Sequence, residues 1–181
     1  MNPKRIVITG GPGTGKSTLI KLLEESGYPC LHEVSREVIL QARKEGHEQL
    51  FLNNPILFSE KLIEGRLEQF RQVTDFKQDI LFYDRGLHDV IAYLNYIESA
   101  FPEEMHKTCK NHSYDLVFIL PPWKEIYTTD NERYESFTEA EKIHSHLKNT
   151  YKSYNYSPIE VPKLPVKQRL SFILEKIKNN L

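Results

Sequence analysis

A glycine-rich stretch near the amino terminus restricts the fold of this chain more than any other feature. Residues 10–17 read Gly-Gly-Pro-Gly-Thr-Gly-Lys-Ser, which fits a glycine, four residues, then Gly-Lys followed by Ser or Thr. The β-branched run Arg5–Thr9 comes before it, and leucines at helical spacing come after it: Leu19, Leu22 and Leu23. The pattern predicts a buried strand that turns through this loop into a helix ending near Gly27.

The loop 10–17, called the phosphate loop below, has the composition of a site for nucleotide phosphates. Glycines let backbone N–H groups approach a phosphate chain, and the amino end of the following helix adds a favourable dipole. Lys16 is expected to reach the β and γ phosphates, and Ser17 to offer its hydroxyl to Mg²⁺. The predicted nucleotide contacts are Gly10, Gly11, Pro12, Gly13, Thr14, Gly15, Lys16, Ser17 and Thr18. A glycine-rich turn that only caps a helix is the alternative.

The charge of the chain excludes some classes of partner. Lys and Arg number 24 and Asp and Glu 25, a formal net charge of −1, so no positive field attracts nucleic acid or anionic membranes. The longest stretch without charged residues, Gln49–Ser59, falls short of the about 18 apolar residues of a spanning helix. With no signal peptide recognisable and 2 cysteines, we expect a cytoplasmic protein with reduced thiols.

Strand-like and helix-like patterns alternate along the whole chain. Such alternation predicts an α/β fold, with a parallel sheet covered by helices on both faces and ligands beyond the carboxyl ends of the strands. No linker interrupts it, so residues 1–181 are predicted to form one domain. The expected strands are Arg5–Thr9, Tyr28–Glu33, Ile80–Asp84, Leu116–Leu120 and Pro158–Val161, and a long helix is expected after Asn54-Pro55.

The end of the third expected strand bears on the reaction. Asp84 closes an apolar run and suits a role at the metal, directly or through water. Arg85 follows it, where many ATP-hydrolysing proteins carry a glutamate that polarises water, and a cation there suits a phosphate or an acceptor better. The guanine-reading sequence Asn-Lys-x-Asp is also absent. These features favour a small phosphotransferase.

The motifs together resemble a known family. They are Gly10–Ser17, Glu33 with Arg36, Asp84-Arg85-Gly86 with Asp89, Ala92 and Tyr93, and Asp130 with Arg133. In this set the chain is similar to the AAA-like P-loop ATPases grouped with the ribosylnicotinamide kinase domain of bacterial NAD-biosynthesis regulators. The resemblance implies a three-layer fold like that of nucleoside and nucleotide kinases, with a five-stranded parallel sheet in the order 2-3-1-4-5. It also implies a lid, expected at about 124–138.

The resemblance suggests roles for single residues. Glu33 stands where deoxynucleoside kinases have a base for the attacked hydroxyl, or it is a charge at a helix amino end. Arg36 contacts acceptor or phosphate, or makes a surface ion pair. Asp89 positions the acceptor or serves its own helical turn, and Arg85 is counted with the catalytic and acceptor-binding residues. Arg133 is the candidate cation for the transferring phosphoryl group.

The sequence thus predicts a Mg·ATP-binding kinase that phosphorylates a nucleoside, a nucleotide or a similar small acceptor. Lys16, Glu33, Asp84, Arg85 and Arg133 are the expected catalytic residues. The alternatives are a nucleotide-dependent switch that binds a partner or a membrane, and a slow ATPase. Basic residues in the last helical segment are expected on a solvated outer face: Lys163, Lys167, Arg169, Lys176 and Lys178.

Overall fold

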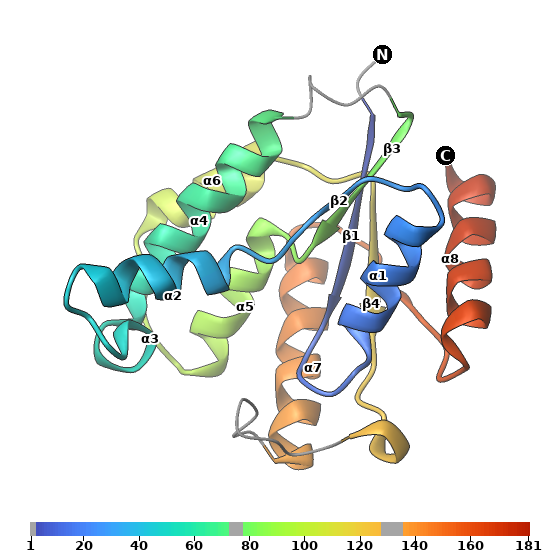
Figure 1. The fold of residues 1–181 in the computed structure, drawn as a ribbon. Coiled ribbons are helices and arrows are strands. Elements are labelled where there is room, and N and C mark those ends of the chain that lie inside the picture. Colours follow the sequence, from blue (N-terminus) through green and yellow to red (C-terminus); the bar gives the residue numbers. More distant parts are fainter. Residues whose placement is uncertain (1–2, 73–77, 128–135) are drawn as a thin grey trace.

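The protein has a parallel sheet with helices on both faces (Figure 1). The structure is a computed structural model that describes residues 3–72, 78–127 and 136–181. Within these residues the strands run in the order β2-β3-β1-β4-β5, which confirms the predicted topology. The strands are β1 (Lys4–Gly10), β2 (Cys30–Leu31), β3 (Ile80–Asp84), β4 (Leu116–Leu120) and β5 (Ile159–Glu160).

The central strands are where the apolar runs predict them, whereas the edge strands are shorter than expected. β3 and β4 coincide with the two continuous apolar runs, since both are covered by helices on two faces. β2 and β5 lie at the edges, and each pairs over two residues with one neighbour. The rest of the expected strands Tyr28–Glu33 and Pro158–Val161 therefore runs as loop beside the sheet.

The longer helices also follow the predicted pattern. Asn54 begins the long helix as expected, because its Oδ1 accepts a hydrogen bond from the Leu57 N–H at 3.1 Å. The short helices α3 and η2 were not predicted, since one turn is too short to show a period. The helices are α1 (Lys16–Glu25), α2 (Ser35–Lys44), α3 (Leu50–Asn53), α4 (Pro55–Arg71), α5 (Leu87–Tyr96), α6 (Glu103–Asn111), the 3-10 helix η2 (Lys124–Ile126), α7 (Phe137–Ser153) and α8 (Val166–Asn180).

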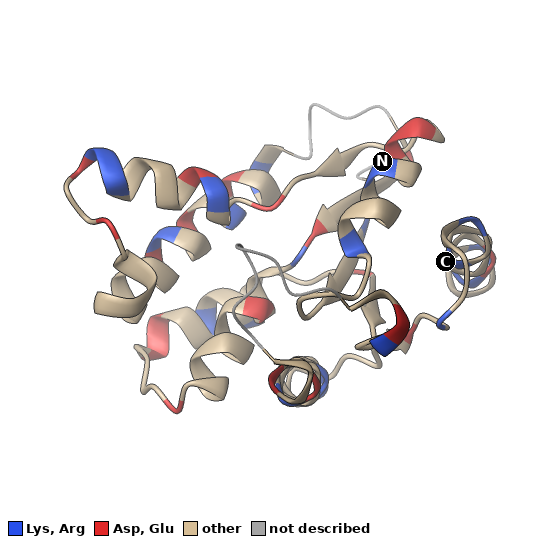
Figure 2. Cartoon of the chain, turned by 60° about the horizontal axis from the view of Figure 1, so that its bottom comes forward, with Lys and Arg blue, Asp and Glu red and all other residues tan. Residues whose placement is uncertain are grey.

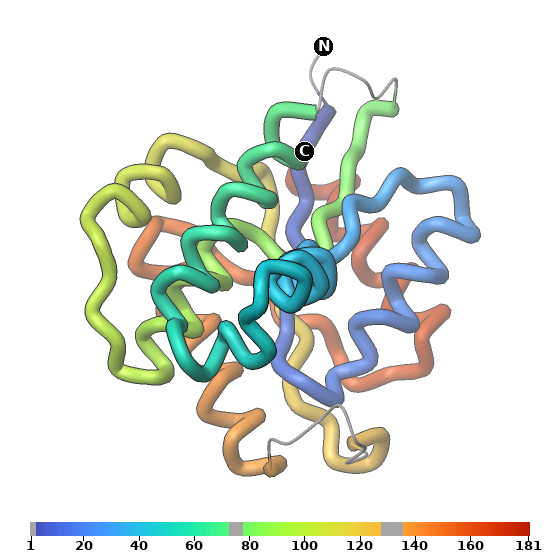
Figure 3. Tube along the Cα trace, turned by 60° about the vertical axis from the view of Figure 1, so that its left-hand side comes forward, coloured from blue at the N-terminus to red at the C-terminus, as the bar shows by residue number. Residues whose placement is uncertain are grey.

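Alternate residues of β1 build the two sides of the core. Ile6 and Ile8 pack in the cluster that α1 and α8 contribute to, whereas Val7 packs with Tyr151 of α7. Figures 1 and 3 show α1 and α8 on one side of the sheet and α4, α5 and α7 on the other. This arrangement is the predicted three-layer α/β fold.

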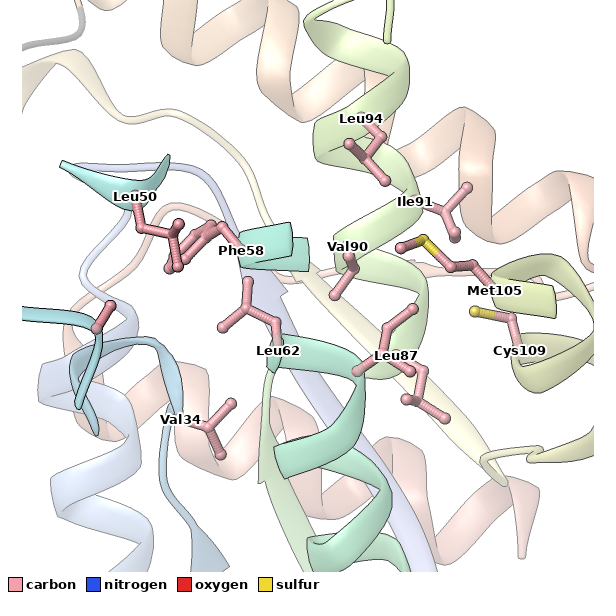
Figure 4. Close-up of a cluster of buried hydrophobic side chains, with 12 residues drawn as sticks. Val34, Leu50, Phe58, Leu62, Leu87, Val90, Ile91, Leu94, Met105 and Cys109 are labelled. Carbon is pink, nitrogen blue, oxygen red and sulfur yellow. The ribbon is translucent and has the colours of Figure 1, made fainter. Parts of the chain in front are cut away.

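A further apolar cluster joins the helices on the α5 side. Side chains from α3, α4, α5 and α6 point toward one another there (Figure 4), among them Leu50, Phe58, Leu62, Val90 and Met105. Because this cluster holds α3 and α4 beside α5, it fixes the wall of the cavity described below.

Charged residues of both signs are spread over the helices (Figure 2). Among the helices of the described residues, none combines the length and apolar character needed to cross a bilayer.

Candidate functional site

The phosphate loop takes a backbone shape that requires its glycines. Gly13 and Gly15 have φ angles of 69° and 75°, in the left-handed region that residues with a Cβ rarely adopt. A Cβ on Gly13 would lie 2.3 Å from the Tyr127 ring, and one on Gly10 would lie 2.9 Å from the Leu120 carbonyl oxygen. The loop therefore joins β1 to α1 with its backbone packed closely against the ends of the sheet.

Lys16 and Asp84 meet at the carboxyl end of the sheet. β1 and β3 are paired in parallel with Ile8 opposite Asp84, which brings the carboxylate beside the start of the phosphate loop. The Lys16 ammonium donates a hydrogen bond to Asp84 Oδ1, and both side chains are about nine-tenths buried. Burial and the nearby Arg85 lower the pKa of Lys16, against the opposing effect of Asp84.

The oxygen atoms beside Lys16 have the chemistry that a magnesium ion requires. Ser17 is the second residue of α1 and is exposed, and Asp84 ends β3. Mg²⁺ prefers one or two protein oxygen ligands and completes its shell with phosphate oxygens and waters. The Ser17 hydroxyl and the Asp84 carboxylate therefore fit the metal of a bound Mg·nucleotide.

Glu33 lies between two arginines just beyond β2. Its carboxylate pairs with Arg85 Nε, and Arg66 Nη2 donates to its Oε1 at 2.8 Å. Burial by itself would raise the pKa of Glu33, but Arg85, Arg66 and Lys16 reverse this and lower it to about 2. Glu33 is thus an ionised hydrogen-bond acceptor held at a fixed position.

Arg85 carries backbone strain at the same place. Its φ angle is 73°, a left-handed conformation that costs a residue with a Cβ roughly 1–2 kcal/mol. The strain is sustained by the Arg85 N–H, which donates to the Ile8 carbonyl at 3.1 Å, and by the side-chain pairs to Glu33 and Asp89. Strained residues of this kind concentrate at functional sites.

Asp89 holds the Arg85 side chain in place through an ion pair. Its Oδ1 accepts from the Thr9 hydroxyl at 2.5 Å and from Arg85 Nη1 at 3.3 Å. Its Oδ2 accepts from the Gly86 N–H at 3.0 Å and from the Tyr151 hydroxyl at 2.6 Å. Because these donors use both oxygens, the geometry favours a role in which Asp89 positions Arg85.

Arg66 belongs to the same network, although the sequence analysis did not single it out. It is 4% exposed, and its Nη1 donates to the Gly86 carbonyl at 2.7 Å while Nη2 holds Glu33. A signal for it exists in the sequence, since Arg66 stands four residues after Leu62 and four before Phe70, on the apolar face of α4. A cation on that face needs a buried partner.

Two cavities open on either side of the phosphate loop. The first, of about 690 Å³ and called the Glu33 cavity, reaches Gly11 and Pro12. Its other walls come from the network above and from α3, α4, α5 and α7: Glu33, Ser35, Gln49, Phe51, Leu52, Phe58, Leu62, Arg66, Arg85, Asp89, Val90, Ala92, Tyr93, Tyr96, Glu139, Ile143 and Leu147.

The second, of about 440 Å³ and called the Trp123 cavity, touches Gly13, Gly15 and Thr18 on the other side of the loop. Trp123, Pro165 and Arg169 form part of its wall.

Arg169 corrects one prediction. It is not on a solvated outer face but 5% exposed, and its Nη1 donates to the Thr14 carbonyl at 3.1 Å. Arg169 stands three residues after Val166 and four before Ile173, both of which pack in the core, so it lies on the inner face of α8 next to the loop. The helix therefore contributes a cation to the phosphate loop from the far end of the sequence.

The remaining predicted site residues are Arg36, Asp130 and Arg133. Arg36 is the second residue of α2 and its side chain is exposed. Arg133 and Asp130 lie outside the described residues, and of the expected lid the structure describes 124–127 and 136–138.

Comparisons with known proteins agree with this architecture. Residues 5–169 match the model of a family described as an AAA domain. No curated protein matches the chain.

Solved structures with the same fold include kinases. The chain is 18% identical to a deoxyadenosine kinase from M. mycoides with dCMP and dCDP bound, covering 97% of this chain and 99% of that one, with a TM-score of 0.67. It is 18% identical to a thymidylate kinase from Candida albicans, covering 99% and 92%, with a TM-score of 0.70. It is 17% identical to a NadR protein in complex with NR, covering 98% of this chain but 50% of that one, with a TM-score of 0.70. At these identities the likeness concerns the fold, which is that of P-loop kinases.

Proposed function

We propose that this chain, which belongs to the AAA domain family, is a kinase that transfers the γ-phosphoryl group of Mg·ATP to a hydroxyl of a small nucleoside-like acceptor. The position of the phosphate loop between the Trp123 cavity and the Glu33 cavity carries the proposal. A hydrolase or a switch needs one nucleotide pocket. A pocket on each side of the loop suits two substrates that meet at a phosphate.

The Trp123 cavity suits the nucleoside part of the donor. Trp123 offers an aromatic face, and the Arg169 guanidinium lies 5.7 Å from its ring centroid. A base bound there would leave its phosphates along Gly13–Lys16, where the backbone N–H groups and the Lys16 ammonium neutralise them. Arg169, which holds the Thr14 carbonyl, would keep the loop in place.

The charges in the Glu33 cavity favour a hydroxyl acceptor over a phosphate acceptor. Arg66 and Arg85 are its described cations, and both are already paired with carboxylates. Glu139 adds a further carboxylate to the wall. A monophosphate would bring about two more negative charges into a site whose described cations are already neutralised. Aromatic side chains in the same wall, among them Phe51 and Tyr93, suit a neutral or cationic ring.

The reaction then follows from the placement of the network. The acceptor hydroxyl oxygen attacks the γ phosphorus, the bond from that phosphorus to the β–γ bridging oxygen breaks, and ADP leaves. Glu33 accepts the hydroxyl hydrogen bond and takes the proton late, which a loose transition state allows even for a weak base. Magnesium held by Ser17 and Asp84 would neutralise charge on the phosphates. Arg85 and, from the lid, Arg133 would stabilise the transferring group.

An acceptor screen tests the proposal directly. The protein is incubated with Mg·ATP and single nucleosides, ribosylnicotinamide or nucleoside 5′-monophosphates, and ADP and phosphorylated product are measured side by side. We expect a hydroxyl acceptor to be converted with one ADP per product, well above the rate of ATP hydrolysis without acceptor.

The screen also separates the alternatives. Turnover of monophosphates alone would contradict the charge argument, and ADP release that no acceptor increases would identify a slow ATPase. Nucleotide binding without turnover would favour a switch. Lys16→Ala serves as the inactive control, and the exposed Lys21→Ala on the same helix as the matched control that keeps activity.

A further inference from the structure

A buried charge on α8 has no counter-ion among the residues that the structure describes. Arg169 is 5% exposed, and burial lowers its pKa with no described carboxylate acting in the opposite direction. An arginine nevertheless remains protonated at neutral pH. The two arginines of the Glu33 cavity differ in this respect, since Arg66 and Arg85 both pair with Glu33. Because a buried charge is costly unless an opposite charge pairs with it, the position of Arg169 calls for an anion from a ligand.

The Arg169 guanidinium lies against the backbone of the phosphate loop. A Cβ on Gly15 would be 3.0 Å from both Nη1 and Nη2, so the absence of a side chain there allows the guanidinium to come this close. Arg169 lines the Trp123 cavity together with Gly15 and Thr18. Figure 1 shows α8 packed beside α1, the helix into which the loop leads. The charge is therefore held at the loop, where the phosphates of a nucleotide are expected.

The hydrogen bond from Arg169 also sets the direction of one peptide group in the loop. Nη1 donates to the Thr14 carbonyl oxygen at 3.1 Å. The Thr14 C=O and the Gly15 N–H belong to the same trans peptide, in which the two groups point in opposite directions. The Gly15 N–H therefore points away from the guanidinium, and no backbone carbonyl of the described residues accepts a hydrogen bond from it. Backbone N–H groups left open in this way bind phosphate oxygens.

We propose that Arg169 is a phosphate-positioning residue, and that the triphosphate of the donor nucleotide is the anion that its buried charge lacks. This inference rests on the proposed function, which makes a nucleoside triphosphate the ligand of the loop. Arg169 acts in two ways. It keeps the Gly15 N–H directed away from itself and open to the phosphates, and its charge attracts them in a buried place where water screens weakly. Neither effect involves the base, so Arg169 acts on the phosphates whatever nucleoside carries them.

Calorimetric titration with ATP and with inorganic tripolyphosphate, both in the presence of magnesium, tests this role without any acceptor. Tripolyphosphate has the same chain of three phosphates but neither base nor ribose. Both affinities should fall at least tenfold, and by similar factors, in Arg169→Met, which removes the charge and the donors but keeps a long side chain. Arg169→Lys keeps the charge and one donor group, so it should bind both ligands at least threefold more tightly than Arg169→Met.

Matched variants separate this role from others. Lys178→Met removes an exposed cation from the last turn of the same helix and should bind both ligands as the wild type does. Trp123→Ala should weaken the binding of ATP but not of tripolyphosphate, which has no base to stack on the ring. Circular dichroism and the unfolding temperature show which variants keep the fold, and Arg169→Gln takes the place of Arg169→Met if the latter does not fold. Tripolyphosphate should raise the unfolding temperature of the wild type more than that of the uncharged variant.

Three results would overturn the proposal. Undiminished affinity of the uncharged variant for tripolyphosphate is the first, and a loss confined to ATP is the second, because Arg169 would then serve the base alone. In both cases the binding of ATP by the wild type would leave the proposed function intact. The third is a wild type that binds neither ATP nor tripolyphosphate, which would refute the proposed function together with this inference.

Discussion

The ion pairs around Glu33 predict a specific dependence of folding stability on pH. Arg85, Arg66 and Lys16 overcome the effect of burial and lower the pKa of Glu33 from an ordinary value of 4.5 to about 2. A difference of about 2.5 pKa units, at about 1.4 kcal/mol each, contributes roughly 3 kcal/mol to the free energy of unfolding near neutral pH.

The sign of the effect follows from the direction of the shift. The pKa is lower in the folded state than in the unfolded chain, so folding is favoured wherever the carboxyl group is ionised. The contribution is complete above the unfolded-state pKa of 4.5 and is lost as the pH falls through about 2. By linkage, about 2 of the roughly 3 kcal/mol should be gone at pH 3.

Urea unfolding of the wild type and Glu33→Gln between pH 3 and pH 7 measures this contribution. At pH 7 the wild type should be more stable by about 3 kcal/mol or more, since the variant leaves Arg66 and Arg85 without their shared partner. At pH 3 the gap should narrow by about 2 kcal/mol, because the unfolded chain then holds a proton on Glu33 that the folded protein releases to keep its ion pairs. Groups that titrate alike in the two proteins contribute equally to both unfolding free energies, so they cancel in the difference.

Glu37→Gln is the control, because Glu37 is exposed on α2 and should show a gap near zero at every pH. A wild-type advantage over Glu33→Gln that stays constant from pH 7 to pH 3 would refute the reasoning, since Glu33 would then ionise no more readily in the folded protein than in the unfolded chain.

Further predictions concern the phosphate loop, the lid and the support of Arg85. Lys16→Ala should retain the fold by circular dichroism but bind ATP more weakly in calorimetry and lose most transfer; normal binding and transfer would remove the phosphate-loop assignment. Arg133→Ala should lower kcat by about 10³-fold while changing ATP affinity little, because a lid cation acts mainly in the transition state; an unchanged kcat would remove it from the mechanism. Tyr151→Phe deletes the 2.6 Å bond to the Asp89 carboxylate and should cost about 1.5–3 kcal/mol in urea unfolding, with a raised KM for the acceptor; a change below about 0.5 kcal/mol would show that Asp89 does not depend on this bond.

The order of the elements and the position of the loop are readable from the sequence because they depend on local patterns. The apolar run Ile80–Asp84 became β3 without any change of boundary, and the glycines of residues 10–15 produced the turn that their backbone freedom predicts. Asp84 could be placed beside the phosphate loop because the carboxyl ends of the parallel strands β1 and β3 lie at the same edge of the sheet. Predicting these features requires only the neighbouring residues in the chain and the rule that sites of parallel sheets lie at the carboxyl ends of the strands.

The hydrogen-bond and ion-pair partners of the charged residues could not be predicted from local sequence patterns. Arg66 follows Glu33 by 33 positions and Arg169 follows Thr14 by 155, and no local period connects either pair. The side-chain roles of Asp89 and Tyr151 likewise depend on the packing of α7 against α5, which brings together residues 62 positions apart.

The sequence by itself therefore determined the glycine-rich shape of the phosphate loop, the alternation of strands and helices and the type of fold, since hydrophobic periodicity and backbone freedom act over a few residues. Only the tertiary structure decided that Glu33 is held by Arg66 and Arg85, and that the last helix supplies a cation to the loop. It also decided that tyrosines enclose His88, whose ring nitrogens have no hydrogen-bond partner among the described residues. Electrostatic pairing and burial depend on distances in space, and those distances are set only when the helices pack on the sheet.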